Sequence, residues 1–208
     1  MPNYVRHNVL IKGDKEDIAR CYEQITKGEH GFSFGNIIPM PEELKLPEGN
    51  LSHYADEWRK ADAERKKEIE DKVKQCVDKG ESVSEKMQQY ADNITKYGFP
   101  TWYGWCIENW GTKWDACEAD IDHYDGHIIL NFDTAWSTPM KVFIALSKQY
   151  PTINIYAAFA DEDLGWNCGE YEIKGGMVTS EKKGDFDFAC EVWGYSKDDL
   201  EDMGIEAD

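Results

Sequence analysis

The sequence lacks the features that mark membrane, secreted and metal-binding proteins. It has no run of 18 apolar residues and no N-terminal segment in which basic residues precede an apolar stretch, which argues against a membrane span and a secretion signal. Its six cysteines are at least 11 residues apart, whereas structural zinc sites use closely spaced pairs. We therefore expect a cytoplasmic protein with reduced thiols, no metal and no other cofactor.

Arginine is absent from the second half of the chain, where acidic residues dominate. Residues 1–114 hold 20 acidic and 17 basic residues, whereas residues 115–208 hold 21 acidic and 6 basic residues, and the whole chain has a net charge of −18. Such a surface repels phosphates, which argues against direct nucleic-acid binding. Two interpretations stay open: the acidic half keeps the protein soluble, or it binds a basic partner, in one version by imitating the phosphates of DNA.

The motifs of the common enzyme classes are also missing. There is no P-loop, no G-x-G-x-x-G, no G-x-S-x-G and no H-E-x-x-H. Paired carboxylates are present, but any acidic surface offers them, and a Cys–His pair is recognised only by its geometry. A hydrolase is therefore the weakest of the hypotheses, and we expect the protein not to be an enzyme.

The composition is that of a folded protein. The chain has 208 residues, of which 41% are hydrophobic, and it contains 8 tryptophans, which excludes a disordered chain. An apolar run over 8–11, a helical pattern over 14–27 and an alternation over 32–34 predict a β-α-β unit over residues 4–35. We expect one α+β domain over residues 1–208.

A helical insertion is expected next, over about residues 52–110. It contains one charged helix over 52–79 with a thin apolar stripe, a second helix from Ser84 to Tyr97 that ends at Gly98, and a short helix from Trp102 to Trp110. The last stretch, 196–208, is acidic and is expected to be a frayed helix or a tail.

The second half predicts a β-β-α-β-β unit on the same sheet. Asp125-Gly126 between two alternating runs is a hairpin signal, and a helix between Pro139 and Pro151 is followed by strands over 153–159 and 166–173. His123 and His127 flank the hairpin turn. We favour a turn over a metal site here, because two histidines four residues apart share a face only on a helix.

Tryptophan is concentrated between the two halves. Two interpretations are open: a pocket that stacks on a small molecule or nucleotide, or a core that holds the insertion on the sheet. Aromatic residues at helical spacing are usually core, so the core is favoured. The candidate pocket residues are Trp102, Trp105, Trp110, Trp114 and Trp136.

Several segments together resemble the YubB-type ferredoxin-like family of plasmid and phage proteins. The most specific segment is 102–116 (WYGWCIENWGTKWDA), and 36–44 (NIIPMPEEL), 132–139 (FDTAWSTP), 160–163 and 169–171 support it. The resemblance spans about residues 4–178. It implies a ferredoxin-like α+β sandwich with a helical insertion, carried by a mobile element. It brings no catalytic residues, and it implies a role in overcoming host defence only by gene association.

Our leading hypothesis is a non-enzymatic mobile-element protein that binds and blocks a host protein through an acidic surface. The expected partner is a host defence or nucleic-acid-handling factor with a basic surface, and the sequence does not predict the oligomeric state. The candidate contacts are Asp161, Glu162, Asp163, Glu170 and Glu172. The alternative is a small-molecule or nucleotide-binding domain with a tryptophan-lined pocket.

Overall fold

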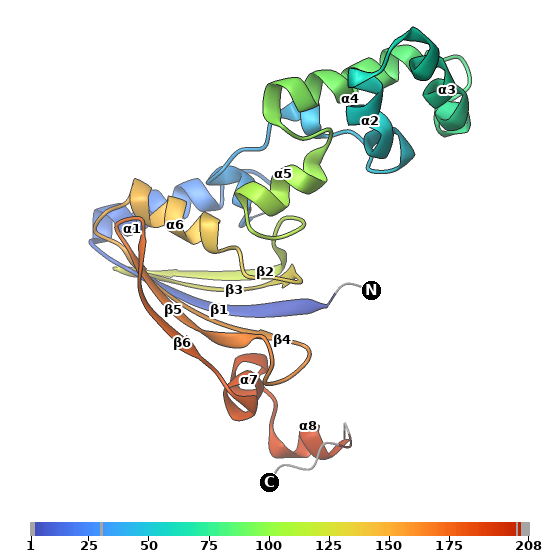
Figure 1. Cartoon of the computed structure of the whole chain (residues 1–208). Helices are drawn as coiled ribbons and strands as arrows, with labels where there is room; N and C mark the ends of the chain where they lie inside the picture. Colours follow the sequence, from blue (N-terminus) through green and yellow to red (C-terminus); the bar gives the residue numbers. More distant parts are fainter. Residues whose placement is uncertain (1–2, 30, 203, 205–208) are drawn as a thin grey trace. The chain divides into compact units, whose positions relative to one another are not determined.

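A six-stranded antiparallel sheet organises most of the chain. The computed structural model describes residues 3–29, 31–202 and 204, and Figure 1 shows the sheet with helices on both of its faces. The chain divides into two compact units. Residues 1–39 and 109–208 form one, called here the sheet unit, and residues 40–108 form the other, called the helical unit.

The sheet unit has the strand order β2-β3-β1-β4-β5-β6, with each strand antiparallel to its neighbours. The strands are β1 (Tyr4–Lys12), β2 (Cys117–Tyr124), β3 (His127–Ala135), β4 (Asn154–Asp161), β5 (Cys168–Lys174) and β6 (Met177–Lys183). Helices α1 (Lys15–Ile25) and α6 (Met140–Gln149) cover one face, and α7 (Phe186–Trp193) lies on the other (Figure 1).

The first four strands with α1 and α6 follow one another as β-α-β-β-α-β, which is the ferredoxin-like sandwich that the YubB-type resemblance implies. Strands β5 and β6 and helix α7 extend it on the β4 side. The predicted α+β class is confirmed.

Alternation along β1 decides which side chains face which helices. Val5, His7, Val9 and Ile11 are buried, whereas the residues between them are partly exposed. Successive residues of a strand point to opposite faces, and the amide of Asn8 donates to the carbonyl of Val192 in α7. The odd-numbered residues therefore face α1 and α6, and the even-numbered residues face the α7 side.

The strand predicted over 32–34 is wrong. Residues Phe34–Asn36 form a short 3-10 helix, because Asp115 satisfies the polar groups that a strand would pair. Its carboxylate accepts from the backbone N–H of Phe34 (2.7 Å) and from the hydroxyl of Ser33 (2.5 Å). The second strand of the β-α-β unit is instead β2, which begins only after the helical unit.

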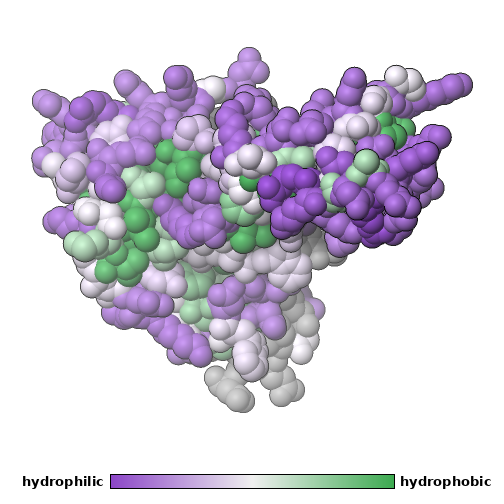
Figure 2. Space-filling model, turned by 45° about the horizontal axis from the view of Figure 1, so that its top comes forward, coloured by the Kyte–Doolittle hydropathy of each residue, from purple (hydrophilic) through white to green (hydrophobic). Residues whose placement is uncertain are grey.

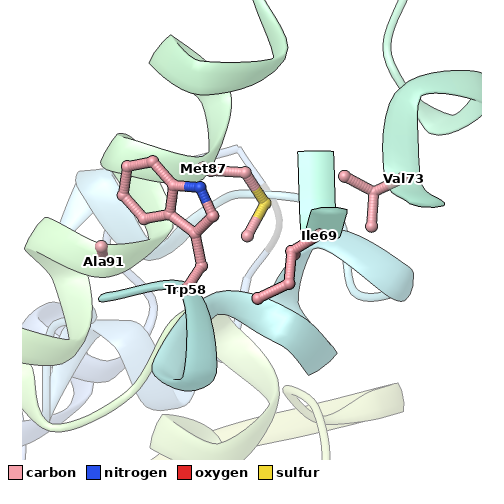
Figure 3. Close-up of a cluster of buried hydrophobic side chains, with 5 residues drawn as sticks. All are labelled: Trp58, Ile69, Val73, Met87 and Ala91. Carbon is pink, nitrogen blue, oxygen red and sulfur yellow. The ribbon is translucent and has the colours of Figure 1, made fainter. Parts of the chain in front are cut away.

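The helical unit contains α2 (Asn50–Lys60), α3 (Ala63–Val73), α4 (Val83–Tyr97) and most of α5 (Trp102–Asn109). The predicted insertion falls largely within it. A small apolar core holds the first three helices together, and Figure 3 shows its side chains pointing toward one another. The core residues are Trp58, Ile69, Val73, Met87 and Ala91.

The single helix predicted over 52–79 is also wrong. The chain leaves the helical conformation at Ala61, and the Asp62 carboxylate caps α3 by accepting from the N–H of Arg65 (2.9 Å). The break lets Trp58 pack against Ile69. In one straight helix these two residues would lie ~16 Å apart along the axis.

The C-terminal stretch contains α8 (Lys197–Asp202). Of the rest of the predicted acidic tail, Gly204 is described, and residues 203 and 205–208 lie outside the described residues. Among the helices that the structure describes, none has the length and apolar character needed to cross a membrane. On the face shown in Figure 2, hydrophilic residues surround smaller hydrophobic areas.

Candidate functional site

The turn between β4 and β5 is braced from within by one of the predicted contact residues. Asp161 is only 6% exposed. Its carboxylate accepts from the side chain of Asn3 (2.6 Å), the N–H of Asp163 (2.9 Å) and the side chain of Asn167 (3.3 Å). Two backbone hydrogen bonds, from Asp161 to Asn167 and from Trp166 to Asp163, close the turn. Asp161 therefore shapes the turn and does not belong to an exposed acidic surface.

The braced turn presents two carboxylates and one indole to solvent. Glu162 and Asp163 are exposed, and Trp166 is 79% exposed, the highest value among the exposed large hydrophobic residues of the described chain. Gly165 between them has a φ of +88°, and a Cβ there would lie 3.2 Å from the backbone of Phe186 in α7. The turn thus sits directly on α7, and only glycine fits at the contact.

Helix α7 adds further exposed carboxylates beside this turn, and α8 follows α7 in the chain. The indole N–H of Trp193 at the end of α7 donates to the carbonyl of Asp161 (3.1 Å), which joins the helix to the turn. Residues 184–202 contain one lysine and no arginine. We call the following surface the acidic end: Glu162, Asp163, Trp166, Asp187 and Glu191.

The other two predicted contacts lie elsewhere, on the sheet itself. Glu170 pairs in register with Ala158, and Glu172 with Tyr156, so both face the α7 side of the sheet. Glu170 is in an ion pair with Lys182 (2.5 Å), and Glu172 is exposed. The five predicted carboxylates therefore occupy three places: inside the turn, on the turn, and on the sheet.

The five predicted pocket tryptophans are divided between the two units. Trp102 and Trp105 belong to the helical unit, and the other three belong to the sheet unit. Trp105 and Trp110 are buried, and the indole of Trp110 donates to the carbonyl of Ile38 (2.9 Å). Four surface hollows of the described residues, up to about 420 Å³, are lined by other side chains.

Trp136 differs from the rest because it is 55% exposed and has a φ of +72°. Bulky side chains rarely adopt this left-handed conformation, which costs roughly 1–2 kcal/mol. Its N–H donates to the carbonyl of Asn3 (2.9 Å), the residue whose side chain also holds Asp161. Trp136 is one of the predicted pocket residues, whereas the structure places it at the same end of the sheet as the braced turn.

A metal site or a nucleophilic mechanism would use histidine and cysteine side chains, and the two candidate histidines lie apart from each other on the hairpin. The described residues contain no group of three or more histidine, cysteine, aspartate or glutamate side chains placed to hold a metal ion. His123 pairs with Ile128 and stacks on Tyr22 of α1 (4.6 Å), whereas His127 pairs with Tyr124 on the opposite face. Burial raises the pKa of Cys21 to about 12, so this thiol is not a nucleophile near neutral pH.

Comparison with known proteins supports the fold assignment. Residues 109–203 match the family model described as the ferredoxin-like domain in Api92-like protein. The crystal structure of the protein Api92 from Yersinia pseudotuberculosis is similar with a TM-score of 0.51 and 12% identity, covering 88% of this chain and 98% of that one. No curated protein matches the sequence.

These comparisons name Api92-like proteins and not the YubB-type family, so the YubB-type resemblance and the mobile-element setting stay predictions. At 12% identity the structural likeness speaks for the fold alone. Residues 109–203 of the chain are thus similar to the ferredoxin-like domain of Api92-like proteins, and the sheet unit has that fold.

Proposed function

We propose that this chain is a non-enzymatic binding protein whose acidic end occupies a basic surface on a partner protein and blocks it. The expected partner is a host defence or nucleic-acid-handling factor. That identity follows from the YubB-type resemblance and from the chemistry of the surface, since proteins that handle nucleic acid carry clustered lysine and arginine.

The observation that carries this proposal is the exposed indole of Trp166 on a braced turn that also exposes Glu162 and Asp163 and that contacts the acidic helix α7. Tryptophan is enriched among the residues that dominate binding energy at protein interfaces. An indole face attracts the cation of a lysine or arginine. Because Asp161 already holds the turn, binding does not have to order it.

The carboxylates and the indole have different roles in this mechanism. The carboxylates attract a basic partner and accelerate encounter, an effect screened beyond ~8 Å at physiological salt. The indole then contributes to the lifetime of the complex by burying its apolar area. A partner held in this way cannot present the same basic surface to nucleic acid.

The test compares three versions of the tagged protein as baits in a bacterial lysate at low salt. They are the parent, Glu162→Lys with Asp163→Lys in the turn, and Glu64→Lys with Glu85→Lys at exposed positions of the helical unit, which change the net charge equally. We expect a basic protein that the parent and the helical-unit variant retain and the turn variant loses.

The affinity of the purified partner is then measured at low and high salt, with Trp166→Ala as an additional variant. We expect binding at least tenfold weaker at high salt, and a faster dissociation for Trp166→Ala. Equal capture by all three baits, or an affinity that does not change with salt, contradicts the proposal.

A further inference from the structure

In the described part of the chain, no helix covers the end of the sheet's α7 side that lies farther from α7 (Figure 1). Helix α7 covers the part near Ala160 and Cys168, where it forms a small apolar cluster with both residues. Beyond Asn8, whose amide donates to α7, the next residues of this face are Leu10 on β1 and its two partners. Register places Ile129 of β3 on one side of Leu10 and Tyr156 of β4 on the other.

The side chains of Ile129, Leu10 and Tyr156 lie next to one another across the middle of the sheet, and we call them the apolar row. Ile129 is 36% and Tyr156 39% exposed, and Leu10 is half-buried. Cross-strand partners point to the same side of a sheet, so the row is continuous. One row further from α7, which is two residues along each strand, the exposed side chains of Tyr124 and Met177 lie on the outer strands of the same face.

Carboxylates stand at both ends of the apolar row. Asp122 of β2 pairs with Ile129, and Glu172 of β5 pairs with Tyr156, so the full sequence across five strands is Asp122, Ile129, Leu10, Tyr156, Glu172. The next row toward α7 ends in the same way, with Asp120 on β2 and Glu170 on β5.

The lysines of this face occupy other positions. Lys12 and Lys174 lie one row further from α7, and the ammonium of Lys12 is 6.0 Å from the ring centre of Tyr156. Lys182 pairs with Glu170. The face therefore has an apolar middle, acidic flanks on both sides and a basic end.

We infer that this face binds a short basic amphipathic helix of a partner protein. Strands ~4.8 Å apart place the flanking carboxylates of Asp122 and Glu172 ~19 Å from each other. A helix ~10–12 Å wide fits between them and leaves room for lysine or arginine side chains on both sides. From Lys12 to Asn8 the open face is ~14 Å long, which corresponds to about nine helical residues.

The basic end sets the direction of the bound helix. The C-terminus of a helix carries a partial negative charge, so it points toward Lys12 and Lys174. The N-terminus points toward α7. This inference rests on the proposed function, because it names the element by which a basic partner is recognised.

The test uses a fluorescent peptide of about 14 residues, composed of leucine and lysine in a helical amphipathic pattern, and measures its anisotropy with the full-length protein. The first variant is Ile129→Lys, which places a cation in the apolar row. Its matched control is Val178→Lys, an apolar residue of similar exposure on β6, which pairs with Ile173 on the other side of the sheet. Urea unfolding checks that both variants remain folded.

We expect saturable binding by the parent, a loss of at least tenfold in affinity for Ile129→Lys, and an affinity within twofold of the parent for Val178→Lys. A second pair separates the charges: Asp122→Lys with Glu172→Lys is expected to weaken binding by a similar factor, whereas Glu64→Lys with Glu85→Lys at exposed positions of the helical unit, which changes the net charge equally, is expected to leave it within twofold of the parent.

Three outcomes overturn the inference. The first is no saturable binding by the parent. The second is equal weakening by both charge pairs, which would show general attraction and leave the proposal for the acidic end intact. The third is a dimer of the parent, seen by sedimentation, that Ile129→Lys dissociates, since a second copy would then cover the face.

Discussion

A buried histidine makes the sheet unit sensitive to mild acid. His7 on β1 is fully buried and stacks on Phe132 (4.7 Å). Its Nε2 is 2.9 Å from the hydroxyl of Thr134, while the hydroxyl also lies 2.9 Å from the carbonyl of Ser137. Because the hydroxyl donates to that carbonyl, the ring donates from Nε2 and its Nδ1 is left as a buried atom without a partner.

Burial lowers the pKa of His7 from 6.5 to about 3. Between these two values the unfolded chain binds a proton that the folded protein does not bind. The stability from the neutral ring is therefore complete above pH 6.5 and is lost progressively as the pH falls toward 3. At 1.36 kcal/mol per pH unit, lowering the pH from about 7 to about 5 costs ~2 kcal/mol of unfolding free energy from this residue alone.

Urea unfolding of the parent and of His7→Leu at about pH 7, 6 and 5 measures this loss. The parent is expected to lose ~2 kcal/mol more than the variant over that range, whatever the stability of the variant at neutral pH. The exposed His123, replaced by Gln, controls for the loss of an imidazole and is expected to follow the parent. Parallel curves for the parent and His7→Leu would refute the reasoning.

Three further substitutions test the turn, the strained tryptophan and the helical core, each by urea unfolding. Asp161→Ala removes the acceptor of three hydrogen bonds and is expected to cost about 2–3 kcal/mol; amide exchange at Asp163 is expected to speed up with it. Trp136→Gly relieves the positive φ and is expected to be up to about 1 kcal/mol more stable than Trp136→Ala, which keeps the strain. Trp58→Ala opens the small core of Figure 3 and is expected to cost the helical unit about 3–5 kcal/mol, seen as lost amide protection in α2, α3 and α4.

Elements set by local signals were predictable from the sequence. The Asp125-Gly126 pair forms the β2–β3 hairpin turn, with Gly126 at a φ of +91°. Gly98 ends α4 in the left-handed conformation, and its N–H donates to the carbonyl of Ile94 (2.9 Å). In both cases a single glycine allows a backbone conformation that other residues rarely adopt.

Elements that depend on distant partners were not predictable in the same way. Asp115 holds the start of the 3-10 helix over residues 34–36 through Phe34, 81 positions before it in the chain, and no local sequence pattern indicates such a contact. Two missed features did have local signals: the cap at Asp62 before α3, and the Asp185 cap and Gly194 that bound α7. Each matches the ordinary start or end of a helix.

The same limit explains why the candidate site is only partly visible in the sequence. Asp161, Glu162 and Asp163 are adjacent and chemically alike, yet the first is buried as a turn brace and the other two face solvent. Glu172 is eleven positions from Asp161 in the sequence. It lies at one end of a cross-strand row over five strands, and Asp122 lies at the other end. The sequence shows where acidic residues are dense. The register of the sheet decides which of these residues flank an apolar surface. That arrangement distinguishes the proposed binding face from an acidic surface that is only solvated.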